Sequence, residues 1–419
     1  MVEWDRFRKY TRRMRELYES GTLKVLSLEV FSVVQPRILI DLLPNLDTLQ
    51  FSSIEGPFIP FISLFLSPRI ASICLSFSVS NPFKTLVAST VAVLPTLCPN
   101  LQAISLFLPR DLMITAAVSE MVLATNQNTL QGFHADSPLT EEASEVVFKL
   151  PNLYNLSVVI AGETSLPSAS LPNLTELEIT YDDKSGLLRL FHGATFEKLE
   201  TVEFFPQSEE TGDFLGAFER VALSSSIENT LSKFYLTTSC SWNPNYSSIL
   251  RFTQLVDLDI GFSCEDGCSS RVDDDTVISL SRAMPKLTVL QLGGYPCGEL
   301  MTGVTAKGLV ALAHHCPDLQ RLCIHFQVAS LSAPPASPGI GYNTEPTGSL
   351  TDCALTELLV GSIPVLEESV SVVAHTLLQI FPRIKWVDFE HQAWKKVEDA
   401  IRLSRRIAGC SSKHPLTTP

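Results

Sequence analysis

The segment Leu171-Pro-Asn-Leu-Thr-Glu-Leu-Glu-Ile179 is one copy of a short phrase that recurs along the chain. Its plainest form is Leu-Pro-Asn-Leu-x-x-Leu-x-Leu, and close copies lie at Leu43–Phe51, Leu150–Val158 and Met284–Leu292. The last two apolar residues of the phrase are two positions apart, so they point to one face if the phrase forms a β-strand. The proline ends any preceding helix, because it lacks a backbone N–H and restricts the residue before it. The phrase therefore predicts a strand that follows directly on a helix.

Thirteen copies, some of them degenerate, run along the whole sequence. Their first leucine-like residues fall at positions 46, 70, 101, 130, 153, 174, 199, 231, 255, 287, 319, 355 and 384. Neighbouring copies are 21 to 36 residues apart, and most of these spacings lie in or near the period of leucine-rich repeats, which is about 20–29 residues. A single unit cannot bury its apolar face alone, so stacking must supply the core. The sequence thus predicts an α/β fold: a leucine-rich-repeat solenoid, shaped as a right-handed α/β horseshoe with parallel strands on the concave face and helices outside.

Segments with helical periodicity precede several copies of the phrase. Asp273–Met284 begins with aspartates suited to capping a helix, and Val304–Cys316 and Val370–Phe381 repeat the plan. Each unit is therefore expected to be one strand plus one helix. Met14-Arg-Glu-Leu17 is a candidate for a first, degenerate strand, and Leu23–Val34 fits a strand or a helix, with helix favoured.

The predicted domain organisation is one solenoid over residues 1–409. Residues 1–35 form its N-terminal capping region, and residues 390–409 form a C-terminal capping helix that begins near Trp394. Residues 330–348 are rich in Pro, Ser and Gly and are expected to be a flexible loop insert. Residues 410–419 are expected to be a disordered tail.

Composition excludes several classes of protein. The 419 residues are 45% hydrophobic and 18% charged, which is too apolar for a disordered chain. A net charge of −14 argues against a nucleic-acid partner, because such proteins concentrate Lys and Arg. The longest apolar stretch, Pro57–Val79, is broken by Pro68-Arg69, so no membrane span is expected. The start of the chain does not resemble a secretory signal, and the ten cysteines show no framework spacing. A cytoplasmic or nuclear location and reduced, buried cysteines are therefore expected.

The repeats resemble a known family. Val304–Ile324 looks like the cysteine-containing repeats of F-box proteins, and Trp4–Leu17, Leu42–Leu46, Leu355–Val360 and Leu377–Ile384 are similar to basidiomycete-type fungal F-box proteins. The resemblance implies substrate recognition for an SCF ubiquitin ligase, with a protein substrate as partner. The residues before Trp4 cannot hold an F-box, so a Skp-type adaptor and a cullin are expected as partners only if an F-box exists upstream. Two alternatives stay open: a solenoid that senses a small-molecule ligand on its concave face, and a repeat scaffold unconnected with ubiquitin.

No arrangement of residues in the sequence favours an enzyme, and no catalytic, cofactor-binding or metal-binding residue is predicted. His314 and His315 are adjacent and cannot share one face of a helix. Cys264 and Cys268 lack a second ligand pair for zinc. The three aspartates at 273–275 are interpreted as helix caps in preference to a calcium loop.

Long loops that leave the strands are the candidate binding site. They fall at 237–246, 261–271, 293–305 and 327–348, and in a solenoid all would emerge along one edge. The expected ridge carries aromatic and acidic side chains suited to protein recognition: Trp242, Tyr246, Glu265, Asp266, Tyr295 and Tyr342. The alternative is that these loops are insertions without a function.

A second open question concerns the basic residues of the C-terminal helix, which are Lys395, Lys396, Arg402, Arg405 and Arg406. A solvated capping face is the favoured interpretation, and contact with anionic lipid or nucleic acid is the alternative.

Overall fold

The computed structural model describes a set of ranges separated by gaps. They are residues 9–19, 43–78, 81–160, 170–182, 195–206, 215–216, 218–219, 227–239, 245–263, 272–293, 303–332, 353–361, 363, 365–389 and 392–411. The chain divides into two compact units. Unit 1 comprises Met1–Glu200 and Ser224–Ile227, and unit 2 comprises Thr201–Leu223 and Glu228–Pro419.

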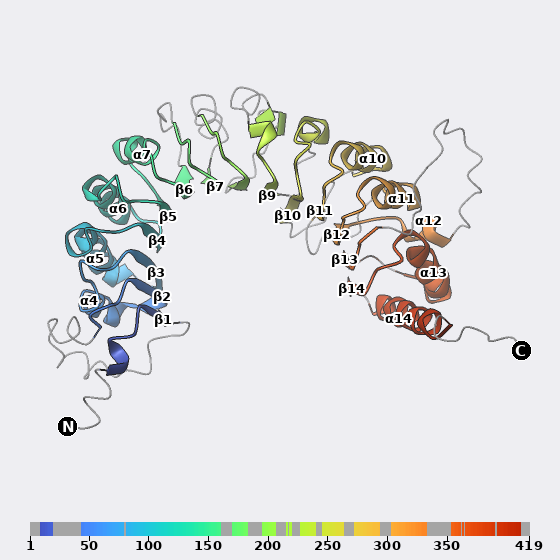
Figure 1. Cartoon of the computed structure of the whole chain (residues 1–419), viewed down its shortest axis with the longest axis horizontal. Coiled ribbons are helices and arrows are strands. Elements are labelled where there is room, and N and C mark those ends of the chain that lie inside the picture. The colour runs from blue at the N-terminus through green and yellow to red at the C-terminus, as the bar shows by residue number, and fades with distance from the viewer. Residues whose placement is uncertain are drawn as a thin grey trace, which may run out of the picture. The chain divides into compact units, whose positions relative to one another are not determined.

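Unit 1 holds seven strands among its described residues, and each strand pairs in parallel with the next along the chain. Its elements are β1 (Glu16–Glu19), β2 (Thr48–Glu55), η1 (Gly56–Phe58), α4 (Ile59–Ile62), β3 (Ser72–Ser78), η2 (Asn81–Phe83), α5 (Lys84–Leu97), β4 (Ala103–Phe107), α6 (Leu112–Ala124), β5 (Gly132–Pro138), α7 (Glu141–Val147), β6 (Asn155–Ile160) and β7 (Glu176–Tyr181). The helices α4 to α7 lie on one side of these strands (Figure 1).

Unit 2 repeats the plan with β8 to β14, which also pair in parallel and in chain order. Its elements are β8 (Thr201–Pro206), β9 (Lys233–Ser239), η4 (Tyr246–Ile249), β10 (Asp257–Ser263), α10 (Asp274–Ala283), β11 (Val289–Leu292), α11 (Ala306–His315), β12 (Arg321–Ile324), α12 (Val328–Ser332), β13 (Glu357–Gly361), η6 (Glu367–Ser369), α13 (Val370–Ile380), β14 (Trp386–Phe389) and α14 (Ala393–Ser411). The 3-10 helix η3 (Ile227–Asn229) spans the sequence boundary between the two units. In Figure 1, α10, α11 and α13 lie on one side of the strands. Both units therefore have the predicted α/β leucine-rich-repeat fold.

The repeated leucines form the core, as the phrase predicts. Each of the thirteen first leucine-like residues is at most 2% exposed, from Leu46 to Ile384. The degenerate strand predicted at Met14–Leu17 is also confirmed, because β1 pairs with β2 in parallel with Glu16 opposite Thr48. Within each unit, stacked strands with a shared apolar interior thus hold the repeats together.

A proline follows the C-cap residue of four helices, as predicted. The C-cap residues of α5, α10, α11 and α13 are Cys98, Met284, Cys316 and Phe381, and each precedes a proline. Their ψ angles are 67°, 67°, 72° and 79°, well outside the helical range. A residue before proline is disfavoured in the helical conformation, so the chain turns into the next strand at this point.

The asparagine of the phrase has a role that was not predicted from the sequence. The side-chain amide of Asn100 donates to the carbonyl oxygen of Pro68 at 2.9 Å, and Asn173 donates to that of Pro151 at 3.0 Å. Both acceptors lie in the preceding repeat, at the turn before its strand. The Pro-Asn pair therefore ends one helix and bonds its repeat to the one before it.

One prediction needs correction, because not every repeat contains a full helix. The connection from β2 to β3 contains only η1 and the four-residue α4, and the connection from β9 to β10 contains the short 3-10 helix η4. In both cases the leucine-like residues are 24 residues apart, at 46 and 70 and at 231 and 255. Repeat length alone does not explain the missing helix, because the 23-residue repeat from Leu130 to Leu153 contains the seven-residue α7.

The predicted ends of the C-terminal helix and of the 330–348 loop differ from the structure by a few residues. The C-terminal helix starts at Ala393, one residue before the predicted Trp394, and includes Cys410 and Ser411 of the predicted tail. The first residues of the predicted 330–348 loop belong to α12. The rest of that loop, the predicted helix at Leu23–Val34 and residues 412–419 lie outside the described residues.

Candidate protein-binding surface

Alternate strand residues in unit 2 point away from the core and form a surface that we call the unit-2 strand face. Its first row comprises Lys233, Asp257, Val289, Arg321, Glu357 and Trp386, which lie opposite one another on β9 to β14. Its second row comprises Tyr235, Asp259, Gln291, Cys323, Leu359 and Asp388. The residues between the two rows, such as Leu258 and Leu290, are fully buried. The period of two in the strand thus separates a core face from a face whose side chains are mostly charged, polar or aromatic, with Val289 and the buried Leu359 as aliphatic members.

Tyr235 and Asp257 form a bonded pair across two neighbouring strands. The hydroxyl of Tyr235 donates a hydrogen bond of 2.6 Å to Oδ2 of Asp257. Burial raises the pKa of the Tyr235 hydroxyl, and its bond to Asp257 raises it further, so the hydroxyl stays protonated as a donor. Oδ1 of Asp257 is buried without a hydrogen-bond partner.

Asp259 is the most perturbed carboxyl group on this face. Burial raises its pKa to about 6, and the charges of Asp257 and Glu203 add to that effect. Arg321 acts in the opposite direction. Negative charges therefore outweigh the positive charge of Arg321 around Asp259, so a further positive charge nearby would stabilise the ionised form of Asp259.

Cys323 does not suit a catalytic role. Burial raises the pKa of its thiol to about 12, with Asp259 adding to the shift. The thiolate is the nucleophilic form of cysteine, and it is disfavoured here at neutral pH. Cys323 is therefore a packing residue of the strand face.

Trp386 is the large exposed side chain of the face. It is 58% exposed and stands on β14, the last strand of the described sheet. The guanidinium carbon of Arg402 lies 5.3 Å from the centre of its ring, which is a cation–π contact. Arg402 is itself held by a 2.7 Å hydrogen bond to Oε1 of the buried Glu398. The indole is thus fixed at one end while much of its surface remains accessible.

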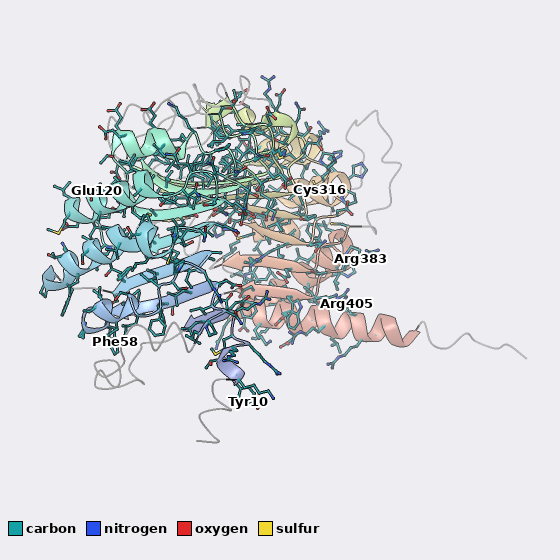
Figure 2. The ribbon with its side chains drawn as sticks, turned by 60° about the vertical axis from the view of Figure 1, so that its left-hand side comes forward. Tyr10, Phe58, Glu120, Cys316, Arg383 and Arg405 are labelled. Atoms are coloured by element: carbon teal, nitrogen blue, oxygen red, sulfur yellow. The ribbon has the colours of Figure 1, made fainter. Side chains whose placement is uncertain are left out.

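Four of the five basic residues of α14 form hydrogen bonds within the protein. Lys395 donates to Glu398 at 2.9 Å and Lys396 to Glu367 at 2.7 Å. Arg405 donates to the carbonyl oxygen of Pro382 at 3.3 Å, and Figure 2 shows it beside the turn that carries Arg383. These contacts support the interpretation of α14 as a capping helix.

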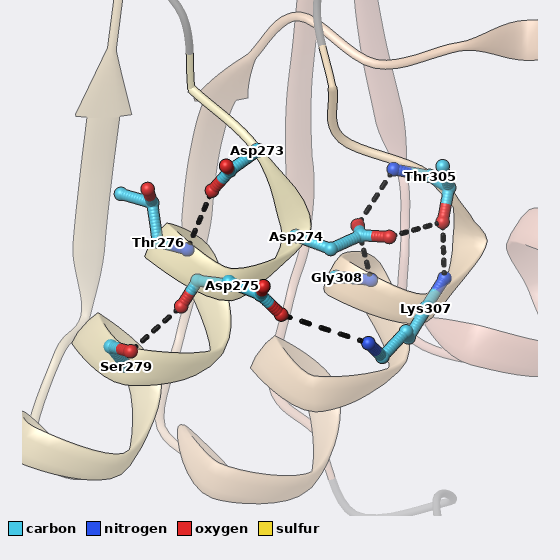
Figure 3. A network of polar contacts seen from close by, with 8 residues as sticks. All are labelled: Asp273, Asp274, Asp275, Thr276, Ser279, Thr305, Lys307 and Gly308. Atoms are coloured by element: carbon cyan, nitrogen blue, oxygen red, sulfur yellow. Dashed lines mark hydrogen bonds and ion pairs between the residues drawn. The ribbon is translucent and has the colours of Figure 1, made fainter.

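Two of the three aspartates at 273–275 cap helices as predicted, whereas the carboxylate of Asp275 forms a 3.8 Å ion pair with Lys307. Figure 3 shows the Asp273 carboxylate accepting a 2.8 Å hydrogen bond from the backbone N–H of Thr276. Hydrogen bonding with Thr276 lowers the pKa of the Asp273 carboxyl group. Asp274 Oδ1 accepts from the backbone N–H groups of Thr305 and Gly308 at 2.8 and 2.9 Å, and its Oδ2 accepts from the Thr305 hydroxyl at 2.6 Å. Asp274 therefore joins the start of α10 to the start of α11.

Cys316 and Cys353 are buried packing residues, in agreement with the sequence analysis. The Cys316 thiol lies 3.6 Å from the carbonyl oxygen of Ser281 and 3.5 Å from that of Met284, and it donates to both. Within the described ranges, no group of three or more His, Cys, Asp or Glu residues is placed to hold a metal ion. No helix in those ranges is long and apolar enough to cross a membrane.

Of the six residues predicted for the loop ridge, one, Tyr246, lies among the described residues. Tyr246 lies on η4 and is 6% exposed, so the prediction of an accessible aromatic residue there is wrong. In this short repeat Tyr246 and Ile249 fill the core where a longer helix would otherwise pack. Trp242, Glu265, Asp266, Tyr295 and Tyr342 lie outside the described residues. The unit-2 strand face was not predicted as a site, although its residues occupy the x positions of the repeat phrase.

Comparison with known proteins finds similarity among solved structures. No protein-family model and no curated protein matches the chain. Among solved structures, the chain is similar to an internalin (inlF) from Listeria monocytogenes, with 12% identity and a TM-score of 0.34 over 93% of this chain and 86% of that one. It is also similar to the Toll–Spatzle complex of Drosophila, with 11% identity and a TM-score of 0.31 over 85% of this chain and 50% of that one. The fold assignment rests on the strands and helices of this chain.

Proposed function

We propose that the chain is a non-catalytic, protein-binding leucine-rich-repeat scaffold and that the unit-2 strand face is its recognition surface. The observation that carries the proposal is Trp386, an indole 58% exposed on a strand and fixed by Arg402. Tryptophan and tyrosine are the residues most often responsible for binding energy at protein interfaces. A partner that covers Trp386 would bury a large apolar area without having to order the side chain first.

The charged residues of the unit-2 strand face supply selectivity. Asp257, Asp259 and Glu357 are acidic, while Lys233 and Arg321 are basic. Arg321 Nε lies 3.6 Å from Glu357 Oε2, so this pair is already matched within the face. Complementary charges on a partner would fix its register and speed its association more than they would raise affinity.

The finer proposal is that this scaffold is the substrate-recognition part of an F-box protein serving an SCF ubiquitin ligase. It is supported by the resemblance of Val304–Ile324 and the other quoted segments to fungal F-box proteins. The substrate would bind the strand face, and an F-box upstream would recruit the Skp-type adaptor and cullin. This proposal keeps the expected cytoplasmic or nuclear location and treats residues 1–409 as one scaffold.

The scaffold proposal is tested by selecting binders from a displayed peptide and protein library against the purified chain. We expect Trp386→Ala to weaken the selected binders by about 2 kcal/mol, or roughly thirtyfold in Kd. Leu366→Ala is the matched control, since Leu366 is a similarly exposed large residue just before η6 rather than on the strand face. Binders that bind Trp386→Ala as tightly as the wild type, or that are lost with Leu366→Ala, would refute the assignment of the surface.

The ligase proposal needs a separate experiment. The chain, extended by whatever coding sequence lies upstream, is co-expressed with a Skp-type adaptor and purified. Co-purification in equal amounts is the expected result. Absence of the adaptor would remove the ligase role and leave the scaffold proposal standing.

A further inference from the structure

The outer face of α5 and α6 has few of the charged residues that a solvent-exposed helix normally carries. The two helices lie side by side in unit 1, on the helical side of its strands (Figure 1). Segment 56–135, which includes both helices, has five charged residues among its 80, whereas the whole chain is 18% charged. A surface helix usually buries one apolar stripe and presents charged or polar residues on the opposite face. The outer face of α5 and α6 departs from that rule.

The exposed positions of the two helices follow one spacing. Steps of three, four and three residues separate four exposed residues on each helix, which are Leu86, Ser89, Val93 and Thr96 on α5 and Met113, Ala116, Glu120 and Leu123 on α6. We call these eight residues the outer seam. Residues three and four apart share one face of a helix, and this is the spacing at which one helix packs against another. Each helix therefore has a second face suited to helix packing, directed away from the core.

The side chains of the outer seam alternate in size. Its four large apolar members are between 38% and 50% exposed, and they are Leu86, Val93, Met113 and Leu123. The small residues Ser89 and Ala116 occupy the second position on their helices. The Ser89 hydroxyl donates to the carbonyl oxygen of Leu86 at 2.9 Å, so its polar group is satisfied within α5. Large residues beside small ones allow the side chains of a facing helix to interdigitate.

Neighbouring and comparable helices do not share this outer seam. On α7 the exposed residues with the same spacing of three and four are Glu142, Glu145 and Lys149, and Lys149 pairs with Glu145. In unit 2, α10 exposes Asp275 and Arg282. The apolar outer seam is thus a property of α5 and α6 and not a requirement of the repeat fold.

We propose that the outer seam packs against the outer seam of a second copy of the chain, as a two-fold symmetric contact of four helices. A two-fold contact uses the same surface on both copies, so that surface must be complementary to itself, as an apolar seam is. The inference goes beyond the proposed function. It involves no residue of the unit-2 strand face.

The charge of the chain favours a second copy as the occupant. The net charge is −14, so two copies repel each other across surfaces that carry their carboxylates. The outer seam has one charged member, Glu120. At the start of the two helices, Lys84 and Asp111 form a 2.8 Å ion pair that neutralises both groups. Two copies can therefore meet at this face with little of the repulsion that acts elsewhere.

An antiparallel arrangement of the helices would accommodate Glu120, which Figure 2 labels on α6. In that arrangement the first position of the outer seam meets the fourth, and the second meets the third. Glu120 holds the third position and would face the small Ser89 or Ala116 of the second copy, not the other Glu120. Its carboxylate would still lose part of its hydration, which limits the affinity of the contact.

The size of the outer seam predicts a weak, reversible dimer. Helices of 14 and 13 residues are about 20 Å long and pack about 10 Å apart, so together they present roughly 400 Å². Interfaces that bury less than about 1,200 Å² over both partners belong to weak, transient complexes. We therefore expect a Kd on the order of 10–100 µM.

Sedimentation equilibrium of the full chain, from about 5 to 300 µM, tests the inference over the expected range of Kd. The wild type should shift from the mass of one chain toward twice that mass as its concentration rises. The double variant Val93→Glu, Leu123→Glu should raise Kd at least about tenfold, because it places further carboxylates in the contact. Glu120→Leu should lower Kd at least about threefold, because it removes the one charge of the outer seam. Even if the double variant failed to fold, the tighter dimer of Glu120→Leu would decide the question.

The control makes the same residue changes elsewhere. Val372 on α13 and Leu403 on α14 are 43% and 59% exposed. Val372→Glu, Leu403→Glu adds the same charge and should change Kd by less than about threefold, because salt screens exposed charges. An equal loss of dimer in both double variants would show general charge repulsion and would overturn the inference. A wild type that stays monomeric throughout, or a dimer unaffected by Val93→Glu, Leu123→Glu, would overturn it as well.

Failure of this inference is distinguishable from failure of the proposed function. Trp386→Ala should dimerise as the wild type does, because Trp386 is not part of the outer seam. The library binders of the unit-2 strand face should bind Val93→Glu, Leu123→Glu with unchanged Kd. Binders that respond to Trp386→Ala while the wild type stays monomeric would leave the scaffold function standing and remove the dimer.

Discussion

The hydroxyl of Tyr235 on β9 donates a 2.6 Å hydrogen bond to Oδ2 of Asp257 on β10. The two residues are diagonal neighbours, since Asp257 stands opposite Lys233 and Tyr235 stands opposite Asp259. The bond therefore joins the two rows of the unit-2 strand face. It also satisfies one oxygen of a carboxylate whose other oxygen is buried without a hydrogen-bond partner.

Tyr235→Phe should destabilise the protein by about 1–3 kcal/mol, because it leaves Asp257 without this donor while keeping the ring. The urea-unfolding midpoint reports the change. Combining Tyr235→Phe with Asp257→Asn should cost less than the sum of the two single variants, because both remove the same bond. Strictly additive effects would mean that the two groups do not interact in solution.

Asp259 should make the stability of the protein depend on pH. Its pKa is raised from 3.8 to about 6 in the folded chain, so the folded state binds the proton more tightly than the unfolded state. The resulting stabilisation is complete below about pH 4 and is lost as the pH rises through about 6. Asp259→Asn should therefore gain stability relative to the wild type between pH 4 and pH 7, by about 1–3 kcal/mol. A difference between the two proteins that stays constant across this range would contradict the shift.

Asp274 and Asp275 are adjacent but should differ in importance. Asp274→Ala removes three hydrogen bonds that join α10 to α11, and should cost about 1–3 kcal/mol. Asp275→Ala removes only a 3.8 Å ion pair between exposed groups, and should cost less than about 0.5 kcal/mol. Thermal unfolding of the two variants tests this prediction, with a larger decrease in Tm expected for Asp274→Ala. Equal decreases in Tm would refute the bridging role of Asp274.

Leu290 and Gln291 test the assignment of the two faces of the sheet. Leu290 is fully buried, so Leu290→Ala should cost about 2–5 kcal/mol through lost contacts and the cavity left behind. Gln291 is the next residue of β11 and belongs to the unit-2 strand face, so Gln291→Ala should cost less than about 1 kcal/mol. If Gln291→Ala proved the more damaging of the two, the faces would be wrongly assigned.

Much of the fold could be predicted from the sequence because one local pattern repeats. The period of two in Leu-x-x-Leu-x-Leu reports which side of a strand is buried, and Leu49, Leu290 and Leu292 lie in the core as that pattern requires. Helices with an Asp or Thr cap and a Pro after the end, such as α10 and α11, were also predictable. These signals are local, so stacking does not alter them.

The candidate site was less predictable, because it depends on which residues neighbouring repeats bring together. Tyr246 was expected on an exposed loop, yet it lies on the short 3-10 helix η4 with its side chain buried. Asp257 and Trp386 are far apart in the sequence, and only the parallel register places them in one row. In a single copy of the repeat phrase, the residues at the x positions do not indicate which residues of other repeats lie beside them.

The most direct test of the central claim is a structure of the chain bound to a partner selected from the library. The account predicts that the partner covers Trp386 and contacts Asp259 or Glu357, with the indole buried at the interface. A tight partner seated on the helices, with Trp386 still exposed to solvent, would contradict it.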